Sequence, residues 1–358
     1  MPSLKEIKGR INSISSTLAI TSAMKMVAAA KLQKAQMAIQ NMLPYERRLH
    51  SMLIDLMGAM NISAAASEDG SVRGSGSAER GFDQSGDRLS LSNRHDLAGM
   101  DGAYSLMAQR EVRKVAIVAF ASNSSLCGAF NSNVIREATA VINEYRASGL
   151  GDADITVYSV GRKMAEAMKK LGFPSPADFT KMSDSPSYEA ASALAQELLD
   201  GFVSGRFDKV ELVYNHYKST SSQPTIRQTY LPLSLADATA DLQAGKIADS
   251  ASESDTNRVA EPVGAPVVRQ GSPTTEDLIV EPSKEALIAT LLPKVIRLRI
   301  FTTLLDSAAA EHAARTVAMQ LATDNGNDLL QELTLEYNKG RQQKITSEIL
   351  DIVGGSMQ

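Results

Sequence analysis

The chain has 358 residues, of which 43% are hydrophobic and only 5% aromatic, and a formal net charge of −4 at pH 7. This length can hold two average domains, and abundant Ala, Leu, Ile and Met without Trp favour helical packing. The net charge offers no large positive field to nucleic acid, and one cysteine and four histidines exclude a disulfide framework and a Cys/His metal cluster. We therefore expect no nucleic acid partner, no metal and no cofactor.

The first residues, MPSLKEIKGRI, contain neither an apolar signal core nor a transit pattern, so we expect a chain that is unexported or already processed. The longest uncharged run, residues 115–135, carries several Asn and Ser side chains and is too polar to span a bilayer. The sequence therefore predicts no transmembrane helix.

Residues 1–60 predict one long helix, with Ser3 as its N-cap. Apolar side chains recur there at steps of three and four residues, as a helix packed on a partner helix requires. The predicted stripe contains Leu4, Ile7, Ile11, Ile14, Leu18, Met24, Val27, Ala28, Leu32, Ala35, Ile39 and Met42. Pro44 predicts a bend. A helix from Leu4 to Met57 spans roughly 80 Å at 1.5 Å per residue, far beyond an average helix.

Two segments have the composition of flexible insertions. Residues 61–110 are dominated by Gly, Ser, Asp and Arg, and residues 236–282 by Ala, Ser, Pro and acidic side chains. Residues 111–235, between them, alternate between strand and helix patterns. The expected elements are strand 115–121, helix 133–147, strand 155–160, helix 162–171, helix 188–203, strand 209–217 and strand 225–232. This pattern predicts a small Rossmann-like α/β domain with a partly parallel sheet.

Residues 283–358 return to the helical period, and Pro293 predicts a start or a kink. The expected stripe contains Leu287, Leu291, Val295, Leu298, Leu305, Ala309, Ala313, Val317, Leu321, Leu330, Leu333, Tyr337, Ile345, Ile349 and Ile352. Because the two terminal helices match in length, we expect them to pair as a long antiparallel coiled coil, an α+β and mainly α fold. Small side chains allow the close approach, namely Ala28, Ala29, Ala30, Ala308, Ala309 and Ala310.

No phosphate-binding, metalloprotease or hydrolase motif occurs, so we expect no catalytic residue. The segment 123–131 lies between a strand and a helix, where a ligand could bind, but a tight connection with Cys127 as a buried thiol is favoured. Glu311 beside His312 invites a general-base interpretation, yet neighbours on a helix face different ways, so a surface pair is favoured.

Both ends of the chain resemble the gamma subunits of rotary F-type ATP synthases. The similar segments are MKMVAAAK, residues 24–31, together with residues 311–325 and 333–355. Residues 125–128 and 230–233 are also similar, so the resemblance covers about three quarters of the chain. The departures are the two insertions and Asn123, Ser124 and Ser125, where the family more often has Asp-Arg-Gly.

The resemblance implies a non-catalytic rotor shaft, present as one copy per complex, standing in a hexamer of alpha and beta subunits. Its implied partners also include the epsilon subunit and the membrane-embedded c ring, so that membrane association comes through the complex. It implies the cytoplasmic face of a bacterial plasma membrane, or the matrix or stroma side of an organelle membrane. Implied partner contacts are Met24, Lys25, Lys31, Ile349, Leu350, Ile352 and Val353. Two alternatives are a coiled-coil scaffold and a small-molecule enzyme built on the α/β domain.

Overall fold

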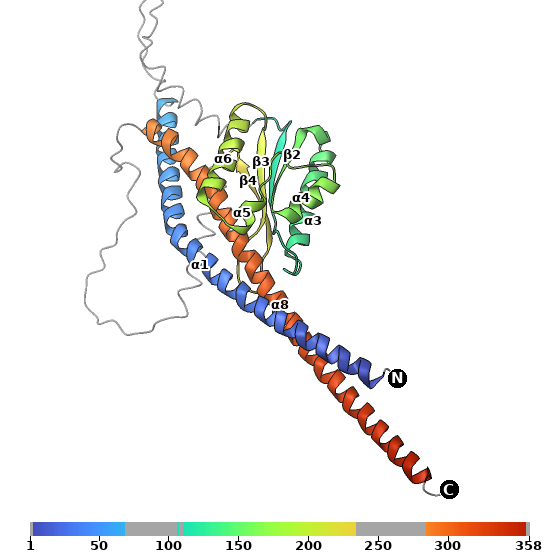
Figure 1. Ribbon diagram of the computed structural model, residues 1–358. Coiled ribbons are helices and arrows are strands. Elements are labelled where there is room, and N and C mark those ends of the chain that lie inside the picture. Colours follow the sequence, from blue (N-terminus) through green and yellow to red (C-terminus); the bar gives the residue numbers. More distant parts are fainter. Residues whose placement is uncertain (1–2, 69–105, 107–109, 234–283, 356–358) are drawn as a thin grey trace, which may run out of the picture.

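The computed structural model describes residues 3–68, 106, 110–233 and 284–355. Two long helices from the two ends of the chain lie side by side, and an α/β domain sits against one of them (Figure 1). The N- and C-termini lie toward the same end of the helical pair. The expected fold class, paired terminal helices with a central α/β domain, is therefore confirmed.

Helix α1 (Leu4–Glu68) is 65 residues long, roughly 100 Å at 1.5 Å per residue. Ser3 caps it as expected, because its Oγ accepts a hydrogen bond from the Glu6 backbone N–H at 3.3 Å. Pro44 lies inside the helix without ending it, and α1 is visibly curved in Figure 1. The helix continues past residue 60, and most of the expected insertion 61–110 lies outside the described residues.

Helix α8 (Lys284–Gly355) is 72 residues long and contains Pro293, so this proline does not start the helix. Proline removes one helical hydrogen bond, a cost that tertiary packing can offset. Here Leu292, Val295 and Ile296 around it are buried in the core, which stabilises the helix through the break in its hydrogen bonding. The expected acidic insertion, residues 236–282, lies outside the described residues.

The two helices pair antiparallel over most of their length. Glu46 near the middle of α1 receives a hydrogen bond from Thr302, whereas Lys25 meets Gln320 and Thr21 meets Thr323. Residues closer to the start of α1 thus contact residues closer to the end of α8. The predicted antiparallel shaft is therefore confirmed.

The α/β domain has a four-stranded sheet in the order β2-β1-β3-β4. Its strands are β1 (Val115–Phe120), β2 (Ile155–Val160), β3 (Lys209–Asn215) and β4 (Thr225–Leu231). Its helices are α3 (Phe130–Ala147), η2 (Asp152–Asp154), α4 (Arg162–Lys170), α5 (Thr180–Asp184) and α6 (Tyr188–Val203). Strands β1, β2 and β3 are parallel and β4 is antiparallel to β3, so the expected partly parallel sheet is confirmed.

Strand β1 is buried on both faces, and its side chains alternate between two cores. Ala116, Val118 and Phe120 face a core shared with α6 and α8. Val115, Ile117 and Ala119 face the core under α3 and α4. Residues of α8 from Ile288 to Leu304 belong to the first of these cores, so the shaft is built into the domain along this stretch.

Candidate functional site

Two glycines of α8 lie in the seam where side chains of α1 come close to the α8 backbone. A Cβ atom at Gly326 would lie 2.6 Å from Leu18, and one at Gly340 would lie 3.1 Å from Leu4. Both distances are shorter than ordinary carbon contacts. Glycine therefore lets the helices approach closely beyond the α/β domain, a role that the sequence had suggested only for alanines.

The expected apolar seam is right in most positions and wrong in several. Ala28 and Ala309 are buried, but Ala310 is buried against the α/β domain, and Ala29 and Ala30 are exposed. Five expected stripe residues are also exposed: Val27 at 57%, Leu321 at 58%, Ile345 at 47%, Ile349 at 55% and Ile352 at 72%. The reason is geometric, because a contact stripe is only about 100° wide and consecutive residues on a helix point in different directions.

The three residues of α1 expected to contact partners, Met24, Lys25 and Lys31, differ in their surroundings. Met24 and Lys25 are half-buried, and the Lys25 Nζ donates a hydrogen bond to Gln320 Oε1 at 2.6 Å across the seam. Lys31 is exposed. Lys25 therefore has a role inside the shaft that the sequence alone did not indicate.

The last turns of α8 extend beyond the start of α1 (Figure 1). Four apolar side chains in this overhang are exposed: Ile349 at 55%, Leu350 at 64%, Ile352 at 72% and Val353 at 51%. Exposed apolar side chains gathered at one place on a protein mark a binding surface. The structure therefore brings together the four C-terminal residues expected to contact a partner, far from Met24 and Lys25 along the shaft.

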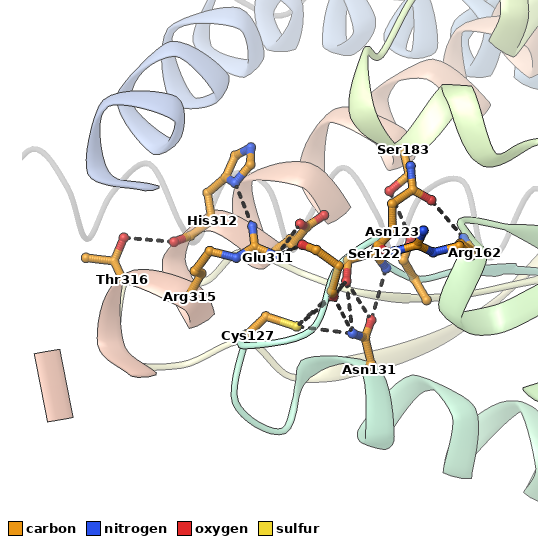
Figure 2. Close-up of polar contacts among 12 residues, drawn as sticks. Ser122, Asn123, Cys127, Asn131, Arg162, Ser183, Glu311, His312, Arg315 and Thr316 are labelled. Atoms are coloured by element: carbon orange, nitrogen blue, oxygen red, sulfur yellow. Dashed lines mark hydrogen bonds and ion pairs between the residues drawn. The ribbon is translucent and has the colours of Figure 1, made fainter. Parts of the chain in front are cut away.

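The loop that follows β1 is held together by its own polar groups (Figure 2). Ser122 Oγ donates to the Ser124 carbonyl at 2.5 Å, and Asn131 Nδ2 donates to Ser122 Oγ at 2.9 Å. Asn123 Oδ1 accepts from the Arg162 backbone N–H at 2.8 Å. Cys127 is buried, as expected. These groups satisfy one another, which favours the predicted structural connection over a ligand site.

Helix α8 contacts this loop through Arg315, whose Nη2 donates to Ser124 Oγ at 2.7 Å and pairs with Glu311 at 2.8 Å. Glu311 is only 8% exposed, so the expected surface pair of Glu311 and His312 is wrong. Burial raises the pKa of Glu311 and lowers the pKa of His312 to about 4. The end of β1 and the loop after it lie against Glu311 and Arg315, which the helical pattern of α8 alone could not show.

A small cavity separates the end of β1 from α8. It is lined by Phe120, Ser183, Leu304 and Glu311, among others, and its volume is about 10 Å³, room for about one water molecule. Within the described part of the chain, no group of three or more His, Cys, Asp or Glu side chains could hold a metal ion. None of the described helices is long and apolar enough to cross a membrane.

The end of β3 is fastened to both shaft helices. Asp306 of α8 accepts two hydrogen bonds, at 2.6 Å from His216 Nδ1 and at 2.9 Å from the Tyr217 backbone N–H. Gln36 of α1 donates to the Tyr217 hydroxyl at 2.6 Å. Sequence reasoning missed this junction because its members lie about ninety or more residues apart and carry no local motif.

The contact between His216 and Asp306 predicts a pH dependence of stability. The hydrogen bond to Asp306 raises the pKa of His216, against burial and nearby Lys218. A raised folded-state pKa gives stability that is complete below the unfolded value of about 6.5 and is lost as the pH rises through the folded value. We expect the stability difference between the wild type and His216→Ala, measured by urea unfolding, to shrink from pH 6 to pH 9. A difference that stays constant would contradict this.

A buried ion cluster crosses the α/β domain beneath α3. Glu211 is 1% exposed and binds Arg227 at 2.7 Å, Lys209 at 2.6 Å and the Tyr145 hydroxyl at 2.7 Å. Burial alone would raise the pKa of Glu211, but the hydrogen bonds from these three partners outweigh it and the pKa is lowered. The cluster therefore stabilises the sheet only while its cations are present.

Arg227→Met is expected to lower the free energy of unfolding by about 3 kcal/mol, because it leaves the buried Glu211 carboxylate short of a partner. Arg136→Met, at an exposed site on α3, is the matched control and should change it by less than about 0.5 kcal/mol. Urea unfolding of both purified variants measures the difference. Equal stabilities would show that the cluster contributes nothing.

Fold and site together define a helical stalk protein, in which paired terminal helices extend from an α/β domain. A family model described as ATP synthase matches residues 3–357. The ATP synthase gamma chain of Phocaeicola vulgatus is 47% identical over 357 residues, covering 100% of both chains. That of Bacteroides thetaiotaomicron is 45% identical over 358 residues, again covering 100% of both. The chain belongs to the ATP synthase gamma chain family, as its resemblance implied.

Solved structures agree at the level of the fold. A chain of the Euglena gracilis mitochondrial ATP synthase, in a structure of OSCP, F1 and the c-ring in rotational state 3, matches with a TM-score of 0.52 and 18% identity. The match covers 99% of this chain and 93% of that one. A chain from the rotor of the same ATP synthase in rotational state 1 matches with a TM-score of 0.50 and 18% identity, covering 96% and 98%. The shared architecture extends over nearly the whole chain.

Proposed function

We propose that this chain is the central rotor shaft of a proton-translocating F-type ATP synthase, which passes rotation of a c ring to a catalytic hexamer of alpha and beta subunits. It contains no catalytic residue and acts as one copy per complex, with the epsilon subunit as a further partner. It is held at the cytoplasmic face of a bacterial plasma membrane through the complex. The observation that carries the proposal is the antiparallel pair α1–α8 with its exposed apolar overhang in a chain of the gamma family.

A rotor shaft must resist twisting and unravelling, and the seam meets both needs. Two helices packed along an apolar stripe are stiffer than one, and the burial of the stripe opposes their separation. Leu32 packs against Ala309 and Ala313, and Gly326 brings the helices close further along. Torque applied at the α/β domain therefore reaches the far end of the pair.

The shaft is also asymmetric, which rotary coupling requires. Helix α1 is curved and begins before the tip of the shaft is reached, so that α8 alone forms the tip (Figure 1). Three catalytic subunits around such a shaft meet three different surfaces at any moment. Each contact favours one conformation of the subunit that it touches, so a turn of the shaft changes which subunit is open or closed.

Apolar surface suits a part that turns. Exposed apolar side chains occur along the shaft at Ile20, Met26 and Val27, as well as in the overhang. Apolar contact has no preferred direction, so it holds the shaft in place without fixed partners that each turn would have to break. We propose that the overhang, including Ile349, Leu350, Ile352 and Val353, is the tip that turns inside the hexamer.

Removal of the chain tests the proposal. We expect membranes from a strain without it to lose proton-driven ATP synthesis, and the tagged chain to restore it and to purify with alpha and beta subunits at one copy per hexamer. A scaffold would instead self-associate and purify in several copies. ATP synthesis that persists without the chain would disprove the proposal.

We further propose that Met24, Lys25 and Lys31 lie near acidic loops of the beta subunits. Lys25→Glu should then reduce ATP-driven proton pumping more than ATP hydrolysis, because opposite charges guide the contact that couples the two. Lys25→Gln, which can keep a hydrogen bond across the seam, separates this effect from loss of the Gln320 contact. Equal losses of pumping and hydrolysis in Lys25→Glu would contradict the assignment.

A further inference from the structure

Tyr217 occupies the point where the α/β domain, α1 and α8 meet. Its ring packs against the cluster of Leu32, Ala309 and Ala313, which lies between the two helices. The same ring contacts a second cluster, formed by Cys127, Phe130 and Ala310, between the domain and α8. One half-buried side chain thus joins two apolar clusters that come from all three parts of the molecule.

Polar contacts fix the orientation of this tyrosine. Its hydroxyl accepts the hydrogen bond from Gln36 of α1 at 2.6 Å. Its backbone N–H donates to Asp306 of α8 at 2.9 Å, and the second oxygen of the same carboxylate binds neighbouring His216 at 2.6 Å. A hydrogen bond to a charged group is stronger than a neutral one, so Asp306 holds this stretch of backbone firmly.

Tyr217 lies along the shaft where packing on the α/β domain gives way to packing between the two helices. Toward the start of α8, residues from Ile288 to Leu304 share the core of the α/β domain. Toward the end of α8, beyond Ala318, the helix has α1 as its neighbour, as the contacts of Gln320, Thr323 and Gly326 show. Tyr217 lies at the boundary, where twist must pass from a globular domain into a pair of helices.

We propose that Tyr217, held by Asp306, is the positioning residue that locks α1 to the α/β domain and so lets both helices turn with it. Helix α8 is anchored through its long shared core, and Leu49, Leu53 and Leu56 in the second half of α1 belong to the same core, but the first half of α1 packs mainly on α8. Beyond that core, and without the contacts of Tyr217, load on the domain would reach the first half of α1 only through the seam, and the pair would yield at this boundary. The inference rests on the proposed rotor function and adds a direct point, beyond the shared core, at which torque enters α1.

The test compares Tyr217→Ala, Tyr217→Phe and wild type in the assembled membrane complex. Tyr217→Ala removes the ring from both clusters, and Tyr217→Phe keeps the ring but removes the bond to Gln36. The control is Tyr188→Ala on α6, whose ring is 45% exposed and packs on Phe301 away from the junction. Purified complexes are first checked for one copy of the chain per hexamer.

The decisive measurement is angular fluctuation of a bead fixed to the α/β domain while the hexamer is immobilised and stalled. For Tyr217→Ala we expect the fluctuation to widen by about a factor of two, because the cavity left at the boundary lets the domain twist against the helices. ATP synthesis should fall by about tenfold while ATP hydrolysis stays within about twofold. Tyr217→Phe should give a smaller change of the same kind, and Tyr188→Ala none.

Unchanged fluctuation in Tyr217→Ala complexes of normal composition would overturn the inference. If Tyr217→Ala does not assemble, Tyr217→Phe decides alone. Fluctuation above the wild-type value then supports the inference, and fluctuation equal to it overturns the inference. Persistence of ATP synthesis without the whole chain would instead overturn the rotor function itself, so the two failures are distinguishable.

Discussion

Replacing Ile349 and Ile352 together by Asp is expected to reduce proton-driven ATP synthesis by at least about tenfold. In the free chain these side chains are 55% and 72% exposed, so the substitution should not disturb the fold. Against an apolar surface of the hexamer, however, each carboxylate loses water without gaining a partner, which costs more than the roughly 1 to 3 kcal/mol of an uncharged polar group. A cost of 1.4 kcal/mol already corresponds to about tenfold in an equilibrium.

The matched control places two Asp residues at Gln343 and Ser347, exposed polar positions on the same overhang of α8. It adds the same charge, at positions four residues apart instead of three, without removing apolar surface. ATP synthesis by membranes and recovery of intact complex are measured for both double variants. Equal losses would show that charge matters and not apolar contact, and no loss in the Ile349 and Ile352 variant would remove the proposed role of the tip.

The second large effect is expected at Ala28, which is 2% exposed and lies in the seam. Ala28→Glu places a carboxylate in this apolar contact and should lower the free energy of unfolding of the purified chain by about 3 kcal/mol. Ala29→Glu, one residue further along α1, is exposed and should change it by less than about 0.5 kcal/mol. Urea unfolding followed by helical circular dichroism measures both.

The two alanine variants differ only in the direction in which one side chain points. If they destabilise equally, the contact face of α1 has been assigned wrongly. If neither does, the two helices are not packed along this part of α1.

The sequence predicted those parts of the fold that depend on local periodicity. The stripe that begins with Leu4 and Ile7 does face α8, since Ile7 is buried and Leu4 lies against Gly340. Helix α6 and strand β2 have the expected bounds, because their apolar patterns end at turn-forming residues. The two prolines were harder to interpret, since tertiary packing decides whether a helix survives a proline.

The candidate site was less predictable, because its contacts join distant parts of the chain. Nothing around Glu311 in the sequence shows that the end of β1 will cover it and turn an expected surface pair into a buried ion pair with Arg315. Asp306 and Tyr217 likewise acquire their roles only when the segment after β3 folds onto α8. The apolar overhang was visible in the sequence because it needs no tertiary partner within the chain.

The claim that the two ends of the chain form one rigid shaft is tested most directly by linking them covalently. Thr21 and Thr323 face each other across the seam with their Oγ1 atoms 3.2 Å apart, so cysteines at both positions should form a disulfide under oxidation. The only native cysteine, Cys127, is buried. We predict that the oxidised complex keeps its ATP synthesis, because helices that turn together lose nothing by being joined. ATP synthesis that stops on oxidation and returns on reduction would show that α1 and α8 must move apart, and would contradict the account.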